Sequence, residues 1–385
     1  MAELSRPVDP PAICTEPGFC TDLPVIFNNS SNTTRKTVMN YQNVYINAIN
    51  YELPPVVVSS QELEHRLAPL YEALHMPLGQ LQALTGIRER RWWQPNTPLS
   101  QGAIAAGHKA LTAADVPAEA IGAITYAGVC RELFEPATAC RVADGLGIGG
   151  EALIYDTSNA CLGVLNGILD MANRIELGQI RAGMVVSCES ARELNEVTIR
   201  RMLKEQDMAL FSRSVATLTG GSGAVAVLLT DGSFNSAQSH KLLGGVALAA
   251  PQHHQLCRWG VEETAQDQLR QFMNTDAVAV MNNGVQLGLD TWKKFLPTMD
   301  WSETDIDRVI CHQVGSAHQT TILKTLDIDA RKDFTTFEFL GNIGTVSLPI
   351  TAAIAAERGI LKAGDRTALL GIGSGLNCMM LGVQW

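Results

Sequence analysis

The chain has 385 residues, 46% of them hydrophobic, which is enough to bury a large core in one or two domains. Its longest apolar runs fall well short of the ~20 residues that span a bilayer, so no transmembrane helix is predicted. The formal net charge of −10 argues against a nucleic-acid-binding surface, because such surfaces carry clustered basic residues.

Residues 1–38 are rich in Pro, Ser, Asn and Thr and show neither helical nor strand periodicity. We therefore predict a flexible extension over residues 1–40. The first residues lack a basic segment followed by an apolar stretch, which predicts no secretory signal and a cytoplasmic location. The 9 cysteines are then expected to be reduced, and their odd number and the lack of a CxxC pair indicate neither a disulfide framework nor a zinc site.

From Tyr41 onward, short β-rich runs alternate with amphipathic helices. The spacing predicts strands at Val44–Ala48 and Ile121–Ala127 and helices at Ser60–Leu74 and Ala103–Ala114. This alternation is typical of an α/β protein.

A further strand ends at Asp156–Asn159, and apolar residues then recur at helical spacing, so Cys161 is predicted to lie on a strand-to-helix turn. Ser158 or Asn159 can cap that helix, and the positive end of the helix dipole is expected to lower the pKa of the thiol. Because the thiolate is the nucleophilic form of cysteine, Cys161 is a candidate nucleophile. The alternative is a buried structural cysteine.

An internal duplication is indicated by a helix, a glycine and a strand that recur as Ala172–Ser187 and Ala353–Ile372. An acidic turn before a strand recurs at Asp115–Ala127 and Glu303–Val314. We therefore predict two pseudo-symmetric halves. A single dinucleotide-binding domain fits less well, because no GxGxxG follows the first strand.

Two polar residues at the tips of strands or loops are further candidates. His312 follows the strand Arg308–Cys311 in HQVGSAH, and Asn342 lies in the glycine-flanked loop LGNIGTVS. A histidine can transfer protons near neutral pH, and an asparagine can hold a histidine or donate to a thioester oxygen. Taken singly, each residue also fits a simple capping or turn role.

Near the C-terminus, the sequence GIGSG follows the strand Thr367–Leu370 directly. Gly373, Ser374 and Gly375 are expected to aim backbone N–H groups at a developing oxyanion. A Walker phosphate loop is excluded because no Lys-Ser/Thr pair follows, and a plain tight turn is the alternative.

The order and spacing of NACLGVLNG, HQVGSAH, GNIGTVSLPI and LLGIGSGLN, together with TGIRERR, resemble the ketoacyl-ACP synthase III branch of the thiolase superfamily over residues 41–385. The resemblance implies the five-layered αβαβα thiolase fold in a homodimer. The N-terminal half, residues 41–230, would carry the nucleophilic cysteine, and the C-terminal half, residues 231–385, the catalytic histidine and asparagine. By this resemblance Cys161, His312 and Asn342 form a catalytic triad.

Within that branch, the segment CRELFEPATA resembles enzymes that condense two long-chain fatty acyl-CoAs head to head in olefin and β-lactone formation. Such enzymes remove an α-proton from an unactivated acyl thioester, which requires a carboxylate. The resemblance assigns this role to Glu135, contributed across the dimer interface. A surface glutamate before Pro136 is the simpler alternative.

The reaction that this resemblance implies is a non-decarboxylative Claisen condensation of two acyl-CoAs through an acylated Cys161, which gives a β-keto acid and requires no metal or redox cofactor. One alternative is a decarboxylating 3-oxoacyl-ACP synthase III that uses malonyl-ACP or malonyl-CoA, with acyl carrier protein as a partner. Another is a non-catalytic subunit of a heterodimeric synthase. For CoA binding, the stretch before TGIR lacks the aromatic and basic residues of the branch, which leaves Arg258 as a candidate.

Overall fold

One ten-stranded sheet runs through both halves of the protein in the computed structural model, which describes residues 39–234, 239–263 and 268–385. The strand order is β6-β5-β7-β8-β2-β9-β14-β13-β12, and β1 pairs with β9. The strands are β1 (Met39–Asn40), β2 (Tyr45–Glu52), β5 (Ile121–Ala127), β6 (Leu153–Thr157), β7 (Ala182–Glu189), β8 (Gly223–Thr230), β9 (His240–Ala249), β12 (Arg308–Cys311), β13 (Arg366–Gly373) and β14 (Asn377–Gln384).

The strand directions repeat on either side of the β2–β9 pair, which joins the halves. On one side of that pair, β2–β8 and β8–β7 are antiparallel and β7–β5 is parallel. On the other side, β9–β14 and β14–β13 are antiparallel and β13–β12 is parallel. The N-terminal half adds parallel β6, where the C-terminal half has only an isolated parallel bridge between Val309 and Asp333. The predicted pseudo-symmetry is therefore confirmed.

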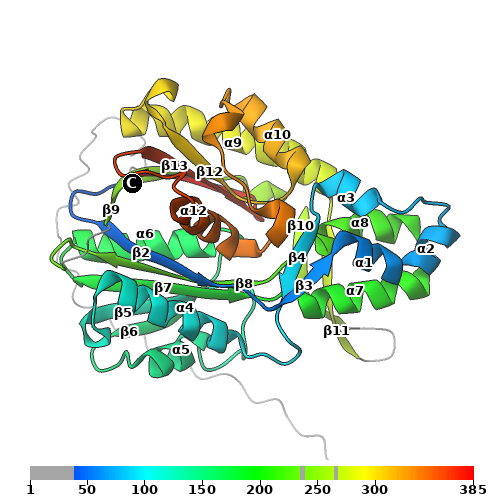
Figure 1. The fold of residues 1–385 in the computed structure, drawn as a ribbon, viewed down its shortest axis with the longest axis horizontal. Coiled ribbons are helices and arrows are strands. Elements are labelled where there is room, and N and C mark those ends of the chain that lie inside the picture. The colour runs from blue at the N-terminus through cyan, green and yellow to red at the C-terminus, as the bar shows by residue number, and fades with distance from the viewer. Residues whose placement is uncertain (1–38, 235–238, 264–267) are drawn as a thin grey trace, which may run out of the picture. The chain divides into compact units, whose positions relative to one another are not determined.

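Helices form layers on the faces of the sheet (Figure 1). Helices α4 and α5 cover the outer face of the N-terminal half, α9 covers that of the C-terminal half with α10 packed beside it, and α6 and α12 lie between the halves. This is the predicted five-layered αβαβα arrangement. The helices are α4 (Leu99–Ala114), α5 (Thr138–Leu146), α6 (Gly163–Glu176), α9 (Ala277–Met299), α10 (Ser316–Thr325) and α12 (Ser347–Glu357).

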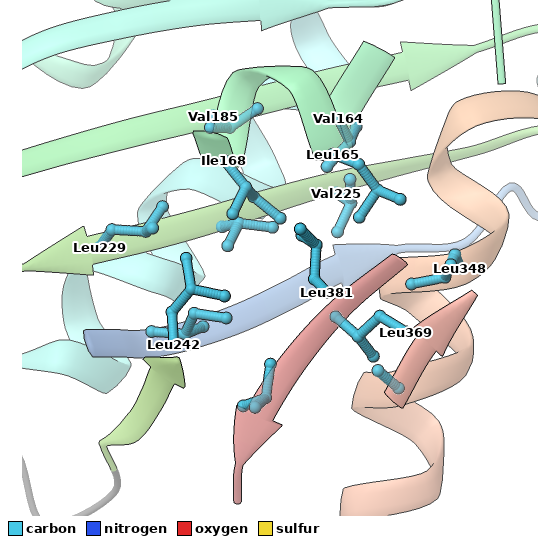
Figure 2. Packing of buried hydrophobic residues seen from close by; sticks show 14 of the residues in the cluster. Val164, Leu165, Ile168, Val185, Val225, Leu229, Leu242, Leu348, Leu369 and Leu381 are labelled. Atoms are coloured by element: carbon cyan, nitrogen blue, oxygen red, sulfur yellow. The ribbon is translucent and has the colours of Figure 1, made fainter. Parts of the chain in front are cut away.

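Helix α12 is enclosed by the protein because strands of both halves of the sheet pack against it. Helix α12 is buried at each position from Ser347 to Ala355, as expected of a helix surrounded by protein. Strands β7 and β8 are likewise buried along their whole length, which explains their unbroken apolar sequences. Figure 2 shows Leu165 and Ile168 of α6 packed among side chains from both halves, including Val225 and Leu381.

A smaller region packs beside the layers, at the right of Figure 1. Its core contains Leu63, Leu67, Leu70, Tyr71 and Phe211. The elements are β3 (Val56–Ser59), α1 (Ser60–Arg66), α2 (Ala68–Ala73), α3 (Gln80–Thr85), β4 (Glu89–Trp92), α7 (Arg192–Glu205), α8 (Met208–Leu218), β10 (Cys257–Glu263) and β11 (Leu269–Thr275).

Both predicted halves belong to one compact unit, Thr37–Trp385. The predicted N-terminal extension lies outside the described residues up to residue 38, and Met39–Asn40 already form β1. The helix predicted at Ser60–Leu74 is two helices, α1 and α2, because the chain turns at Leu67. Within the described ranges, no helix combines the length and apolar character needed to cross a membrane.

Candidate active site

Cys161 lies on the predicted turn between β6 and α6. The first helical amides are not capped by Ser158 or Asn159, so that prediction is wrong. The Val164 N–H instead donates to Oγ1 of Thr345 at 2.7 Å, across 181 residues of sequence. The cap of the helix that follows Cys161 therefore comes from the other half of the fold.

The thiol of Cys161 has a raised pKa, contrary to the lowering predicted from the helix dipole. Burial raises its pKa to about 12, and Cys257 and Glu189 add to the effect. Desolvation of the thiolate thus outweighs the helix dipole. Cys161 is a neutral thiol at physiological pH and needs a base to become a nucleophile.

His312 follows β12 and is buried, and its backbone N–H donates to the Leu370 carbonyl at 2.9 Å. Its Nδ1 has no hydrogen-bond partner among the described residues. Burial, with a smaller effect of His318, lowers the pKa of His312 to about 3. The imidazole is therefore neutral near pH 7, with one ring nitrogen carrying a free lone pair.

Asn342 lies between the short helix α11 (Phe337–Leu340) and α12. Its backbone donates to the Thr219 carbonyl at 3.0 Å and accepts from the Gly221 N–H at 2.9 Å. Its Oδ1 accepts from the Gly344 N–H at 3.1 Å, which leaves the side-chain NH₂ as a donor. Thr345, which caps α6, follows in the same loop.

The GIGSG segment differs from its prediction because the strand does not end at Leu370. Strand β13 continues to Gly373, which pairs with Asn377, so the turn before β14 consists of Ser374, Gly375 and Leu376. A methyl group added to Gly373 would lie 3.4 Å from the backbone nitrogen of Cys161. The end of β13 therefore meets the Cys161 turn directly.

These contacts bring three predicted segments to one place. The Cys161 turn touches Gly373, whose strand is hydrogen-bonded to the backbone of His312, and the helix after Cys161 is capped from the Asn342 loop. The segments lie at the carboxyl ends of strands and the start of the central helices, where α/β folds commonly place their sites.

Glu135 lies elsewhere, on an exposed loop of residues 129–137 that we call the finger loop. Leu133, Phe134, Glu135 and Pro136 at its tip are all exposed, and Phe134 is fully exposed. Glu135 has no hydrogen bond or ion pair with any residue in the described ranges. A large exposed aromatic side chain beside an unpaired carboxylate is typical of an interaction surface.

Arg258 lies on strand β10, with its side chain exposed and its guanidinium 5.9 Å from the centre of the Phe272 ring. Its role in CoA binding stays a prediction.

Two residues near the site were missed in the sequence. Thr345 caps α6, and Glu189 ends strand β7 as a buried carboxylate. A charged residue at the end of the apolar run AGMVVSCE was a usable signal for Glu189. Thr345 gave no local signal, because its partner is distant in sequence.

The chain is similar to known condensing enzymes. Residues 296–385 match the family model "3-oxoacyl-[acyl-carrier-protein (ACP)] synthase III C terminal". An acyl-CoA:acyl-CoA alkyltransferase from Shewanella oneidensis is 57% identical over 349 residues, which cover 90% of this chain and 100% of that protein. Among solved structures, cerulenin-bound OleA from Xanthomonas campestris matches with a TM-score of 0.85 and 34% identity, over 90% of this chain and 98% of that one. A variant of that OleA with bound lauric acid and lauroyl-CoA matches with a TM-score of 0.83 and 34% identity, over 90% of this chain and 100% of that one.

Proposed function

This chain belongs to the acyl-CoA:acyl-CoA alkyltransferase family, and from that membership we propose a residue-level mechanism for its reaction. The protein is a condensing acyltransferase that joins two fatty acyl-CoA thioesters without decarboxylation, giving a β-keto acid. The observation that carries the mechanism is the convergence of the Cys161 turn with the segments that carry His312 and Asn342.

In the first step, Cys161 attacks the thioester carbonyl of one acyl-CoA. Because the thiol and the imidazole are both neutral near pH 7, His312 accepts the thiol proton as the C–S bond forms. Backbone N–H groups of Cys161 and the Gly373–Gly375 segment stabilise the oxyanion. The bond to CoA then breaks, and the departing thiolate takes the proton from His312.

In the second step, Glu135 removes an α-proton from a second acyl-CoA. His312 and the free NH₂ of Asn342 hold the enolate oxygen. The enolate carbon attacks the acyl-Cys161 carbonyl, the new C–C bond forms, and the Cys161 sulfur leaves and is reprotonated with the proton that Glu135 removed. Water then hydrolyses the β-ketoacyl-CoA to a β-keto acid and CoA.

Glu135 acts on the partner subunit's site in this proposal. The support is the finger loop itself, since its exposed tip combines Leu133 and Phe134 with the carboxylate. In a symmetric homodimer, each finger loop would bury its apolar tip against the partner and present Glu135 beside the partner subunit's Cys161. Water exclusion at the buried interface would make the carboxylate a stronger base.

Each step transfers protons or acyl groups, so the reaction is redox-neutral and we propose that no metal or redox cofactor takes part. The substrates are CoA thioesters, and we place the enzyme in the cytoplasm, where acyl-CoAs are available. A β-keto acid is a reasonable precursor for olefin or β-lactone formation, and we propose that pathway class. Arg258 is retained as a candidate contact for CoA.

The family model also fits a decarboxylating synthase that takes its carbanion from malonyl-ACP or malonyl-CoA. In that reaction loss of CO₂ generates the carbanion, so Glu135 would be dispensable. A non-catalytic subunit is disfavoured because Cys161, His312 and Asn342 are all present.

The test supplies purified protein with one long-chain acyl-CoA as the sole substrate. CoA release is measured together with the β-keto acid, or its decarboxylated ketone, by mass spectrometry. We expect continuing CoA release and product, both lost in Cys161→Ser. In Glu135→Ala, product and continuing CoA release should be lost, while one CoA per Cys161 is still released. CoA release that stops at one equivalent per Cys161, with product only after malonyl-ACP or malonyl-CoA is added, would establish the decarboxylating reaction instead.

A further inference from the structure

Glu189 is a buried carboxylate that the proposed mechanism does not use. It ends strand β7, and only 4% of the residue is exposed. Burial raises the pKa of Glu189, while hydrogen bonds from Cys130 and Val129 oppose the rise. A buried carboxylate is costly to maintain unless its oxygens are hydrogen-bonded, so its partners indicate what it does.

Both oxygens of Glu189 bind the base of the finger loop. The Val129 N–H donates to Oε1 at 2.9 Å, and the Cys130 N–H donates to Oε2 at 3.2 Å. The carbonyl of Cys130 accepts from the Tyr126 hydroxyl at 2.9 Å. The first two residues of the finger loop are thereby fixed to the carboxyl ends of β5 and β7.

On its other side, Glu189 faces the candidate active site. A methyl group added to Gly344, two residues after Asn342, would lie 3.4 Å from Cγ of Glu189. The carboxylate is also close enough to Cys161 to contribute to the raised pKa of its thiol. Glu189 therefore lies between the finger loop and the loops that carry Cys161 and Asn342.

The rest of the finger loop is held by two further carboxylates. Glu132 accepts from the Ser100 N–H at 2.7 Å. Asp156, at the end of β6, accepts from the N–H groups of Thr138 and Ala139, each at 2.9 Å, where α5 begins. Both ends of the loop are fixed, and the tip with Glu135 is exposed.

We infer that Glu189 is a positioning residue. It fixes the finger loop beside the loops that carry Cys161 and Asn342 in its own subunit, and so determines where Glu135 is presented to the partner. The inference rests on the proposed role of Glu135 and extends it. Placement of a base to within a fraction of an ångström matters for proton abstraction, because small displacements reduce rates steeply.

The variant Glu189→Gln tests this role with little change in side-chain size. An amide has one acceptor and one donor, so one of the two backbone N–H groups of the finger loop would face an NH₂ group. The matched control is Glu176→Gln, because Glu176 also accepts from two consecutive backbone N–H groups, those of Gln42 and Asn43, each at 3.0 Å. Glu176 lies at the far end of α6 from Cys161.

Three quantities are measured on the full-length protein: amide hydrogen exchange of residues 129–137, the burst of CoA release from acylation of Cys161, and steady-state β-keto acid formation. For Glu189→Gln we expect at least tenfold faster exchange in the finger loop and at least tenfold slower product formation, with the burst amplitude retained. Alkylation of Cys161 by iodoacetamide should also shift to lower pH, because a nearby negative charge is removed. Glu176→Gln should match wild type in all these quantities.

Wild-type exchange and product formation in Glu189→Gln would overturn the inference. Equal losses of burst and product, with unchanged exchange in the finger loop, would also overturn it, since that pattern describes general damage to the site. If wild-type protein forms no product from acyl-CoA alone, the proposed function fails separately. Exchange of the finger loop still decides whether Glu189 anchors it.

Discussion

The loops that carry Cys161, His312 and Asn342 differ from the finger loop in how many of their contacts come from the same chain. Cys161 and His312 sit among buried residues, and the loops around them are joined by backbone and side-chain hydrogen bonds from both halves. The finger loop is fixed at both ends and at Glu132, and its tip, with Phe134 and Glu135, is exposed.

This difference separates the two half-reactions. In the proposed mechanism, acylation of Cys161 uses groups that a single chain supplies, whereas α-proton removal uses Glu135, which lies on the exposed tip of the finger loop. Condensation should therefore depend on a second subunit, while acylation should not. The following predictions test that division, beginning with the largest expected effect.

Replacing Cys161 with Ala should abolish both half-reactions, because no other group can hold the acyl chain. We expect product formation to fall on the order of 10⁴-fold or more, with no burst of CoA release. Rapid-quench assays of CoA and intact-protein mass spectrometry measure the two steps. Cys140→Ala, at an exposed cysteine on α5, is the control for loss of a thiol. Acylation that persists in Cys161→Ala would identify a different nucleophile.

Replacing Glu135 with Gln should separate the half-reactions. Loss of a general base typically costs about 10²- to 10⁴-fold, and we expect that loss in product formation with an unchanged burst. The same rapid-quench assay reports both quantities. Glu151→Gln, an exposed surface change, should behave as wild type. A Glu135→Gln enzyme with wild-type condensation would remove the proposed base.

Replacing Phe134 with Ser should weaken the proposed homodimer. Burial of a phenylalanine contributes about 1.5–3 kcal/mol, and a symmetric interface contains it twice, so the dissociation constant should rise about 10²-fold or more. Sedimentation at several concentrations measures this, with Leu177→Ser as a control because Leu177 is exposed but lies away from the finger loop. An unchanged dimer would place the interface elsewhere.

Acid should destabilise the folded protein through His312. Its pKa is about 3 when folded and near 6.5 when unfolded, so protons bind the unfolded chain first as pH falls below about 6.5. The free energy of unfolding should therefore decrease by about 1.4 kcal/mol per pH unit from this group between pH 6 and pH 4. Urea titrations of wild type and His312→Asn measure it. Parallel pH profiles for the two proteins would contradict the assignment.

Replacing Thr345 with Val should remove the cap from α6 at nearly constant volume. Loss of a cap costs about 1 kcal/mol, which predicts a small decrease in the midpoint of urea unfolding. Thr320→Val, on an exposed face of α10, is the control. If the two variants are equally stable, the long-range cap contributes nothing measurable.

The sequence predicts the strands of this fold well where burial is complete. Ile121–Ala127 and Arg308–Cys311 match β5 and β12 residue for residue, because both are apolar runs with clear boundaries. The duplicated segments also correspond, as the α6–β7 and α12–β13 connections occupy matching places.

The electrostatics and long-range contacts of the site could not be predicted from apolar runs or repeated segments of the sequence. The pKa of Cys161 depends on burial by distant segments, which local sequence does not reveal, so the helix dipole gave the wrong direction. The contact of Gly373 with the Cys161 turn and the capping by Thr345 both join residues remote in sequence. The roles of His312, Asn342 and Glu135 remain predictions that mutagenesis must test.

The most direct test of catalysis across the interface mixes two inactive variants, Cys161→Ala and Glu135→Gln, under conditions that exchange subunits. A mixed dimer has one site in which an intact Cys161 meets an intact Glu135 from the other subunit, so random exchange should restore about a quarter of wild-type condensation. If Glu135 acts within its own subunit, every site lacks one group. In that case the mixture would stay as inactive as its components.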